Sequence, residues 1–383
     1  LDRISENTGA DFISIPHNSN ISKGYMFDTE TLRGQALSPD YIAARMRWEQ
    51  VTEVTQIKGD SETHPDLSPD DPFADFETYP FYIQRDATPY VAGQGDYIRS
   101  ALKLGLGIER EVGQNPYQFG LIGSTDAHTG MASAEEDNFH GKLAQDSIPE
   151  NKVCGAIAGS VTGWDMSASG LAAVWAEENT RESILAAMKR REVYATSGPR
   201  IGVQFFAGSG ITEDLLQAED VYAAATAVGV PMGGELSSLA GDAPAFLVRA
   251  VKDPMGANLD RIQIVKGWLE EGGQLREQVF DVAWSGSRLP DSSGKVPPVG
   301  DTVDRATATY TNDIGAPELA TVWRDPLFDP AQSAFYYVRV LQIPTPRHSF
   351  YDALALGLDS AKDQPDTIQD RAYTSPVWYR PRS

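Results

Sequence analysis

Three histidines of this sequence each follow a short run of apolar or β-branched residues. They are His17 in the string I-P-H-N-S-N, His64 in K-G-D-S-E-T-H-P, and His128 in G-S-T-D-A-H-T-G. In folds built from alternating strands and helices, the loops that leave the carboxyl ends of the strands meet on one face, and active sites are built there. We therefore expect three loops that are distant in sequence to meet at one site.

Asp126 and His128 are the strongest candidates for metal binding. They are two residues apart in an extended segment, which points both side chains to the same side. A carboxylate and an imidazole placed in this way bind one divalent cation or two adjacent ones. With His17 at a neighbouring strand end, we predict that His17, Asp126 and His128 are metal ligands. The alternatives are a hydrogen-bonded histidine in a turn and, for His17, a loop residue whose ring caps backbone carbonyls.

The loop after residues 51–57 carries a second group of candidates, namely Lys58, Glu62 and His64. A lysine can hold an anionic substrate group, and an imidazole can transfer a proton near neutral pH. We therefore treat these three residues as candidate catalytic groups, and the alternative is a solvated charged turn.

Composition and missing motifs exclude several classes of protein. The chain has 54 acidic and 32 basic side chains, a net charge of −22, and such a surface repels phosphate backbones and anionic lipids. We expect no nucleic-acid or membrane partner. The sequence lacks the serine hydrolase elbow, the phosphate-binding P-loop, the dinucleotide fingerprint and the C-x-x-C motif, and its single cysteine excludes multi-thiolate metal sites. Its first residues carry no readable targeting signal, so the sequence assigns no compartment.

The secondary structure that the sequence predicts changes near residue 200, from alternating strands and helices to mostly strands. Before it, short apolar runs alternate with segments of helical period, which is typical of βα units and a mostly parallel sheet or barrel. The expected strands are residues 11–15, 51–57, 119–122, 171–175 and 193–195, and the expected helices are residues 39–48, 96–112 and 179–191, the last with Asn179 as N-cap.

The second half of the chain is rich in β-branched and aromatic residues between turn signals. This pattern predicts a β-rich, sandwich-like domain over residues 201–383, after a first domain over residues 1–200. The expected strands of this half are residues 245–251, 261–266, 278–284, 306–310 and 335–341.

Five strings of this sequence together resemble those of a bacterial family catalogued as DUF3604, a domain of unknown function, over essentially the whole chain. That family resembles the PHP (polymerase and histidinol phosphatase) superfamily of metal-dependent phosphoesterases, which use a distorted seven-stranded βα barrel. In that scheme the late Asp-x-His motif falls on Asp126 and His128, and a lone histidine after an earlier strand falls on His17. The strings cover residues 15–20, 56–65, 123–130, 194–200 and 373–379.

The resemblance implies an α/β fold in which the C-terminal part of a PHP-like barrel, over residues 1–200, precedes the β-rich domain over residues 201–383. Family members begin with a His-x-His motif and further metal ligands that are not found in this chain. We therefore expect an N-terminal segment of the same gene product as a partner that completes the barrel and carries those ligands.

The function that the resemblance implies is that of a metal-dependent hydrolase, most simply a phosphoesterase with a small anionic substrate. The superfamily uses two or three divalent ions, commonly Zn, Mn or Fe, and a metal-activated hydroxide attacks the phosphorus. Two alternatives stay open. One is a metal hydrolase of another bond, such as a sulfate ester or an amide, and the other is a non-catalytic secreted module for binding or structure.

Overall fold

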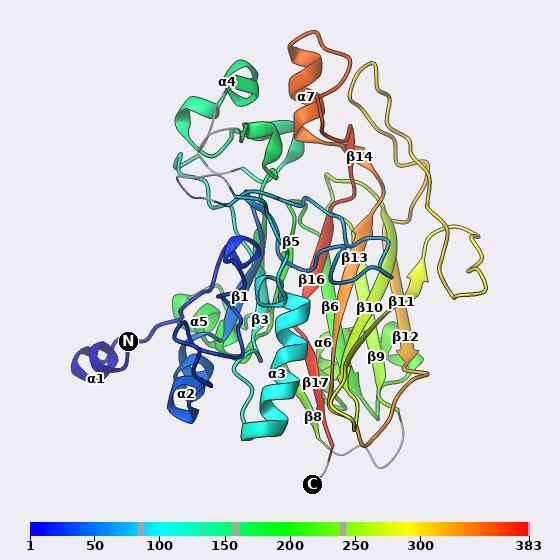
Figure 1. The fold of residues 1–383 in the computed structure, drawn as a ribbon. Coiled ribbons are helices and arrows are strands. Elements are labelled where there is room, and N and C mark those ends of the chain that lie inside the picture. The colour runs from blue at the N-terminus through cyan, green and yellow to red at the C-terminus, as the bar shows by residue number, and fades with distance from the viewer. Residues whose placement is uncertain (83–87, 132, 155–160, 238–242, 382–383) are drawn as a thin grey trace.

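A computed structural model describes residues 1–82, 88–131, 133–154, 161–237 and 243–381 of the chain. These residues form a mixed α/β fold in which strands predominate (Figure 1). The helices are α1 (Asp2–Thr8), α2 (Pro39–Trp48), α3 (Ile98–Val112), α4 (Pro149–Cys154), α5 (Arg181–Arg190), α6 (Val221–Thr226) and α7 (His348–Ala355).

The strands of the described residues form four sheets. The three-stranded sheet has the order β2 (Gly59–Asp60), β1 (Val51–Gln56), β3 (Gly120–Gly123). The eight-stranded sheet has the order β11 (Leu275–Trp284), β10 (Leu259–Leu269), β13 (Ala334–Gln342), β16 (Arg371–Thr374), β5 (Val193–Thr196), β4 (Leu171–Val174), and β17 (Val377–Arg380) pairs with both β13 and β8 (Glu235–Ser237). The four-stranded sheet has the order β12 (Glu318–Arg324), β9 (Ala245–Val251), β6 (Gly202–Gly208), β7 (Val230–Pro231), and the smallest sheet pairs β14 (Thr345–Pro346) with β15 (Thr367–Ile368).

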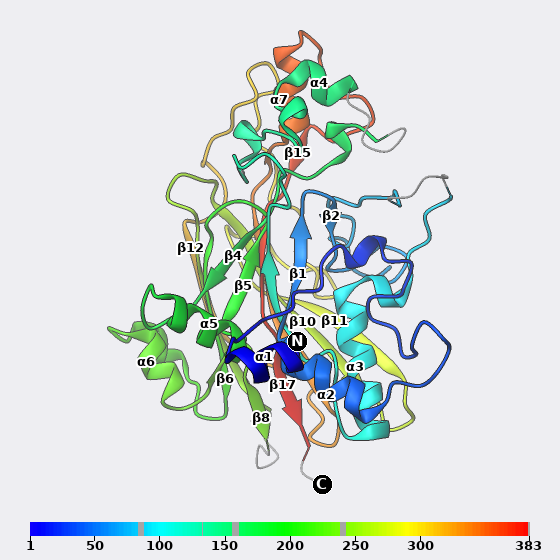
Figure 2. The same cartoon turned by 90° about the vertical axis from the view of Figure 1, so that its left-hand side faces the viewer.

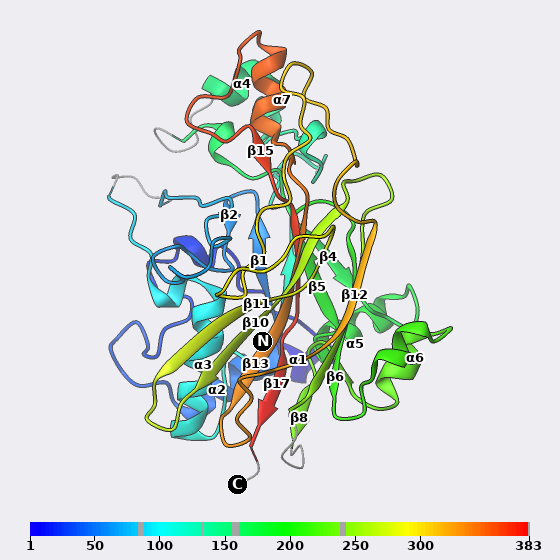
Figure 3. The ribbon, with the colours of Figure 1, turned by 90° about the vertical axis from the view of Figure 1, so that its right-hand side faces the viewer.

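The eight-stranded sheet lies between two other layers (Figures 1 and 3). Alternate residues of a strand point to opposite faces, and β13 shows the consequence. Val338 and Val340 belong to a buried cluster with Phe246 of the four-stranded sheet. Tyr337, the residue before Val338, belongs to a second cluster with Leu102 of α3. One face of the eight-stranded sheet therefore packs against the four-stranded sheet, and the other face packs against α3 and the three-stranded sheet.

Helix α3 is held in place by its own amphipathic sequence. Ile98, Leu102 and Leu106 recur at helical spacing and are buried, which provides one apolar face. The helix ends at Gly113, whose backbone is left-handed with φ of 76°, the usual helix stop for glycine. Figure 2 shows α2 and α3 at the same end of the molecule, below the carboxyl end of β1.

Much of the predicted secondary structure is confirmed. The predicted helices at residues 39–48 and 96–112 are α2 and α3, and residues 51–57, 119–122 and 193–195 correspond to β1, β3 and β5. The eight-stranded sheet joins β4 and β5 to strands from the end of the chain, so it crosses the boundary predicted at residue 200.

Four predictions about elements are wrong. Residues 11–15 form no strand, because only isolated backbone hydrogen bonds, such as that from Ser14 N–H to Trp48 C=O (2.7 Å), tie this segment to its neighbours. Residues 306–310 form no strand, because residues 305–308 make a turn closed by an isolated bridge between Asp304 and Thr309, and Thr180 rather than Asn179 caps α5. The described sheets are mostly antiparallel, with only β1–β3 and β8–β17 paired in parallel, and none of them closes into a barrel.

Helices α4 and α7 and the small β14–β15 sheet lie together at one end of the molecule, away from both termini (Figures 1 and 3).

Among the described residues, no helix has the length and apolar character needed to cross a membrane.

Candidate functional site

The carboxyl ends of the parallel strands β1 and β3 carry a group of polar side chains. The register pairs Thr55 with Gly123, so both strands end at the same edge of the sheet. A further backbone hydrogen bond, from Ser124 N–H to Thr55 C=O (3.1 Å), continues the pairing into the loop. The predicted convergence of strand-end loops is therefore present for these two strands. We call the polar group the strand-end cluster: Glu53, Lys58, Ser124, Asp126, His128 and Lys142.

Asp126 is the centre of this cluster. Its backbone is left-handed, with φ of 48°, a conformation that aspartate tolerates better than most residues. Its Oδ2 atom accepts hydrogen bonds or ion pairs from Lys58 Nζ and from Lys142 Nζ, the latter at 2.8 Å. Its Oδ1 atom lies 3.4 Å from His128 Nε2. Lys142 Nζ lies 3.3 Å from the same imidazole nitrogen, so two ammonium groups and one imidazole surround one carboxylate.

The loop that supplies Lys142 is fixed to the Asp-x-His segment by its backbone. His128 N–H donates to Lys142 C=O (2.8 Å), and Lys142 Nζ donates to Asp126 C=O (3.0 Å). The lysine is 8% exposed, whereas the side chain of His128 is 57% exposed. The imidazole therefore lies at the open side of the cluster and the two lysines lie at its base.

His17 lies near Glu53, whose carboxylate its charge influences. Pro16 C=O accepts from Glu53 N–H (3.0 Å), which fixes this segment alongside β1. The His17 ring is exposed, and its Nδ1 lies 2.6 Å from Asn18 Nδ2. Glu53 accepts hydrogen bonds from Asn18 N–H and from the Ser124 hydroxyl. Among the described residues, no hydrogen bond joins His17 to Asp126 or His128.

Burial and neighbouring charge shift the titration of the cluster. Burial, together with the neighbouring ammonium of Lys142, lowers the pKa of Lys58 to about 7. Burial also lowers the pKa of Lys142, whose charge in turn lowers the pKa of His128. The pKa of Glu53 is raised, because burial outweighs the hydrogen bond from Ser124. The cluster thus contains groups that can change protonation near neutral pH.

Glu62 lies in a different environment, a buried ion-pair network that we call the arginine network. Its carboxylate accepts from Arg99 Nη2 (2.6 Å), Arg339 Nη1 (2.9 Å) and the hydroxyl of Tyr337 (2.5 Å). Asp71 binds the same two guanidinium groups, each at 2.8 Å. The four charged side chains are at most 2% exposed. Glu62 therefore joins α3 to β13, and it contacts no member of the strand-end cluster among the described residues.

His64 also lies outside the strand-end cluster. Its ring packs at 5.6 Å from the ring of Tyr97 and 6.1 Å from that of Tyr90. Its Nδ1 accepts a hydrogen bond from Asp66 N–H (3.1 Å). Of the three loop residues proposed from the sequence, the structure brings only Lys58 to Asp126 and His128. The catalytic roles of Glu62 and His64 stay predictions.

Three members of the cluster were not identified from the sequence. Lys142 and Ser124 have no distinctive spacing, and Lys142 reaches Asp126 only through the fold. Glu53 had a usable signal: it is the one charged residue in the buried strand V-T-E-V-T-Q, and a buried carboxylate in such a strand requires partners.

The described residues contain no group of three His, Cys, Asp or Glu side chains in the arrangement of a metal site. A family model described as "Protein of unknown function (DUF3604)" matches residues 1–381 of the chain. A search of the curated proteins found no match.

Proposed function

The chain belongs to the DUF3604 family, and from this premise we propose that it is a hydrolase of phosphate esters that works with divalent metal ions. The observation that carries the proposal is the meeting of a carboxylate, an imidazole and two lysines at the carboxyl ends of two parallel strands. Such strand ends are where α/β enzymes bind their ligands. The likeness to the PHP phosphoesterases is part of this proposal.

Asp126 and His128 fit a divalent ion as two of its ligands. Two donors on adjacent corners of a tetrahedral site, with bonds of about 2.0–2.1 Å, are separated by about 3.4 Å. The distance between Asp126 Oδ1 and His128 Nε2 is 3.4 Å. Lys58 and Lys142 bind Oδ2 of Asp126, so its Oδ1 is left to bind the ion. When bound, such an ion supplies Lewis acidity toward water and toward the phosphoryl oxygens.

The chain's own residues supply binding and proton transfer. Lys58 and Lys142 place two amino groups beside the carboxylate of Asp126, and in its protonated form either one can attract the anionic part of a substrate. His128 lies at the open side, and the charge of Lys142 lowers its pKa, which favours the neutral imidazole that a metal ion requires. Glu53 and Ser124 form a hydrogen-bonded pair at the base, with the exposed His17 ring nearby.

The test is a metal and substrate survey of the purified chain. The protein is stripped with chelator, reloaded with Zn, Mn or Fe, and assayed with phosphomonoesters, phosphodiesters, a sulfate ester and an amide, while metal content is measured by mass spectrometry. We expect metal-dependent phosphate release and bound metal that falls in Asp126→Asn and His128→Ala. His140→Ala is the control, since His140 lies outside the cluster. Cleavage of only the sulfate ester or amide, or no metal uptake at all, would overturn the proposal.

A further inference from the structure

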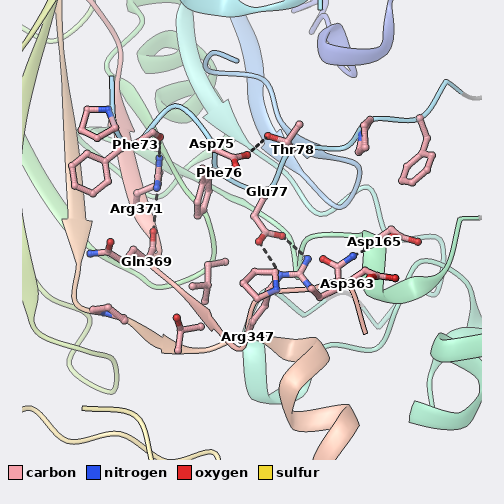
Figure 4. A pocket seen from close by; sticks show the side chains of 18 residues that line it. Phe73, Asp75, Phe76, Glu77, Thr78, Asp165, Arg347, Asp363, Gln369 and Arg371 are labelled. Carbon is pink, nitrogen blue, oxygen red and sulfur yellow. Dashed lines mark hydrogen bonds and ion pairs between the residues drawn. The ribbon is translucent and has the colours of Figure 1, made fainter. Parts of the chain in front are cut away.

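A cavity of about 620 Å³ opens beside residues 72–81, and none of the strand-end cluster lines it (Figure 4). Its walls come from three separate parts of the chain: residues 72–81, Asp165 and residues 344–371. Small-molecule sites commonly measure about 300–1,000 Å³, so this cavity has the size of a ligand site. The donors and acceptors at its surface indicate what kind of ligand it suits.

One ion pair in the cavity is already saturated. Arg347 donates from Nε and Nη2 to the two carboxylate oxygens of Glu77, both at 2.8 Å. Its remaining donors bind the backbone carbonyls of Trp164 and Met166 and the hydroxyl of Ser349. Arg347 and Glu77 therefore form a rigid part of the wall and offer no uncompensated charge to a ligand.

Arg371, in contrast, keeps a free donor. The side chain is 2% exposed, and its guanidinium lies 3.6 Å from the centre of the Phe76 ring. Its Nη1 donates to Phe73 C=O (3.0 Å) and its Nε to Gln369 C=O (3.4 Å). Within the described part of the chain, Nη2 has no hydrogen-bond partner. A buried guanidinium fixed by two carbonyls and a ring thus presents one oriented donor where it lines the cavity (Figure 4).

Acceptors line the same cavity as this donor. Asp75 is exposed and accepts through Oδ1 from the Thr78 hydroxyl (2.9 Å), which leaves its second oxygen available. Asp165 and Asp363 add two more carboxylates to the lining. With Glu77 there are four carboxylates against the two guanidinium groups of Arg347 and Arg371. This excess of negative charge disfavours an anionic ligand.

Rings make up part of the remaining wall, together with Thr78, Gln364, Thr367, Ile368 and Gln369. Flat apolar rings suit the C–H faces of a sugar, while carboxylates and a guanidinium suit its hydroxyls, because a hydroxyl both donates and accepts. A simple cation would satisfy the carboxylates but would face the Arg371 donor. The ring residues of the lining are Pro72, Phe73, Phe76, Pro80, Phe81, Pro344 and Pro365.

We propose that this cavity binds a neutral polyhydroxylated ligand of the size of a mono- or disaccharide, through hydroxyl contacts to Arg371 and Asp75. The site is separate from the strand-end cluster and does not depend on the hydrolase activity. It makes the chain a carbohydrate-binding protein in addition to the function proposed above.

The experiment is calorimetric titration of the full chain with maltose, cellobiose, sucrose and glucose, and with inorganic phosphate and choline as charged probes. We expect at least one neutral sugar to bind and both charged probes to fail. Asp75→Ala should weaken sugar binding about tenfold or more, because it removes a hydrogen bond to a charged group. Thr367→Trp, which places an indole in the cavity, should abolish binding. Asp359→Ala, an exposed aspartate outside the lining, is the matched control.

Thermal unfolding of each variant separates loss of binding from loss of fold. Asp75 is exposed, so Asp75→Ala carries the test even where Thr367→Trp unfolds the chain. The proposal is overturned if no sugar binds at millimolar concentration, if phosphate or choline binds instead, or if folded Asp75→Ala binds sugar as tightly as the wild type.

Discussion

The segment from Lys58 to His64 contributes to two charged regions of opposite character. In the arginine network, Glu62 and Asp71 each bind both Arg99 and Arg339, and hardly any of these side chains is exposed. In the strand-end cluster, two lysines share one carboxylate and the imidazole of His128 is open to solvent.

Burial and charge pairing together distinguish a structural charge cluster from a candidate functional site. Buried ions are tolerated when each has partners of opposite charge and enough hydrogen bonds, and the arginine network meets that condition. The strand-end cluster differs, because Lys58 and Lys142 share the carboxylate of Asp126 and the imidazole of His128 is open to solvent. An open group of this kind can accept a substrate, whereas a closed network with every charge paired has no such capacity.

The largest expected effect is on stability in the arginine network. Arg339→Met leaves Glu62 and Asp71 with a single guanidinium, and breaking a buried pair in this way costs about 3–5 kcal/mol of unfolding free energy. Urea unfolding measures the loss. Arg249→Met, which removes an exposed arginine paired with Glu318 at 2.6 Å, is the control and should cost less than about 1 kcal/mol. Equal losses in the two variants would contradict the structural role of the network.

The second effect is on catalysis in the strand-end cluster. Lys142→Met should lower kcat/KM for the phosphate ester by about 10²–10³-fold, the usual result of removing one charge-stabilising donor. Lys142 is 8% exposed, so its loss also costs about 1–3 kcal/mol of unfolding free energy, and kcat/KM is compared on samples that urea unfolding shows to be folded. Lys103→Met, at the edge of the arginine network beside Glu277, should leave kcat/KM unchanged. Loss of activity in Lys103→Met alone would reverse the assignment of the two regions.

The third effect concerns pH and Asp60, which accepts from Glu62 N–H (2.7 Å) and from the Tyr373 hydroxyl (3.0 Å). Burial, and then the charge of Glu62, raises the pKa of Asp60 to about 7. Between pH 5.5 and pH 8 the folded protein must release this proton, while the unfolded chain has already released it, so stability falls as pH rises. In Asp60→Asn the unfolding free energy should fall by about 2 kcal/mol less between pH 5.5 and pH 8 than in the wild type. The wild type loses about 1.36 kcal/mol for each of the roughly 1.5 pH units between pH 5.5 and the pKa of Asp60.

The measurement for Asp60 is a series of urea unfolding curves at several pH values. Asp40→Asn, at an exposed position in the first turn of α2, is the control and should keep the wild-type slope. An Asp60→Asn variant that loses stability with rising pH as steeply as the wild type would show that this carboxyl is ionised throughout.

The smallest expected effect is that of His64→Phe. The ring packs against Tyr90 and Tyr97 and makes no contact with the strand-end cluster among the described residues, so an aromatic replacement keeps the packing. Steady-state kinetics should show kcat/KM within about twofold of the wild type. A pH-dependent loss of kcat of tenfold or more would return His64 to the catalytic groups.

The sequence by itself determined the local features of this protein. Helix α3 follows from its apolar spacing and from Gly113, and β1 follows from its β-branched run. Asp126 and His128 are two residues apart, but the segment is not extended as predicted, because the backbone of Asp126 is left-handed. The motifs also identified the family. Each of these features depends on residues that are neighbours in the chain, so the sequence pattern contains the information.

Only the tertiary structure decided which charges meet. Glu62 and Arg339 are 277 residues apart, and Glu62 is buried between Arg99 and Arg339 because α3 packs on the large sheet. Lys142 reaches Asp126 because a loop from farther along the chain binds His128 through the backbone. The sheet that joins β5 to β16, and the absence of a closed barrel in the described chain, depend on pairing between distant strands. Such contacts leave no local pattern, because the partners of a buried charge are chosen by packing and not by sequence distance.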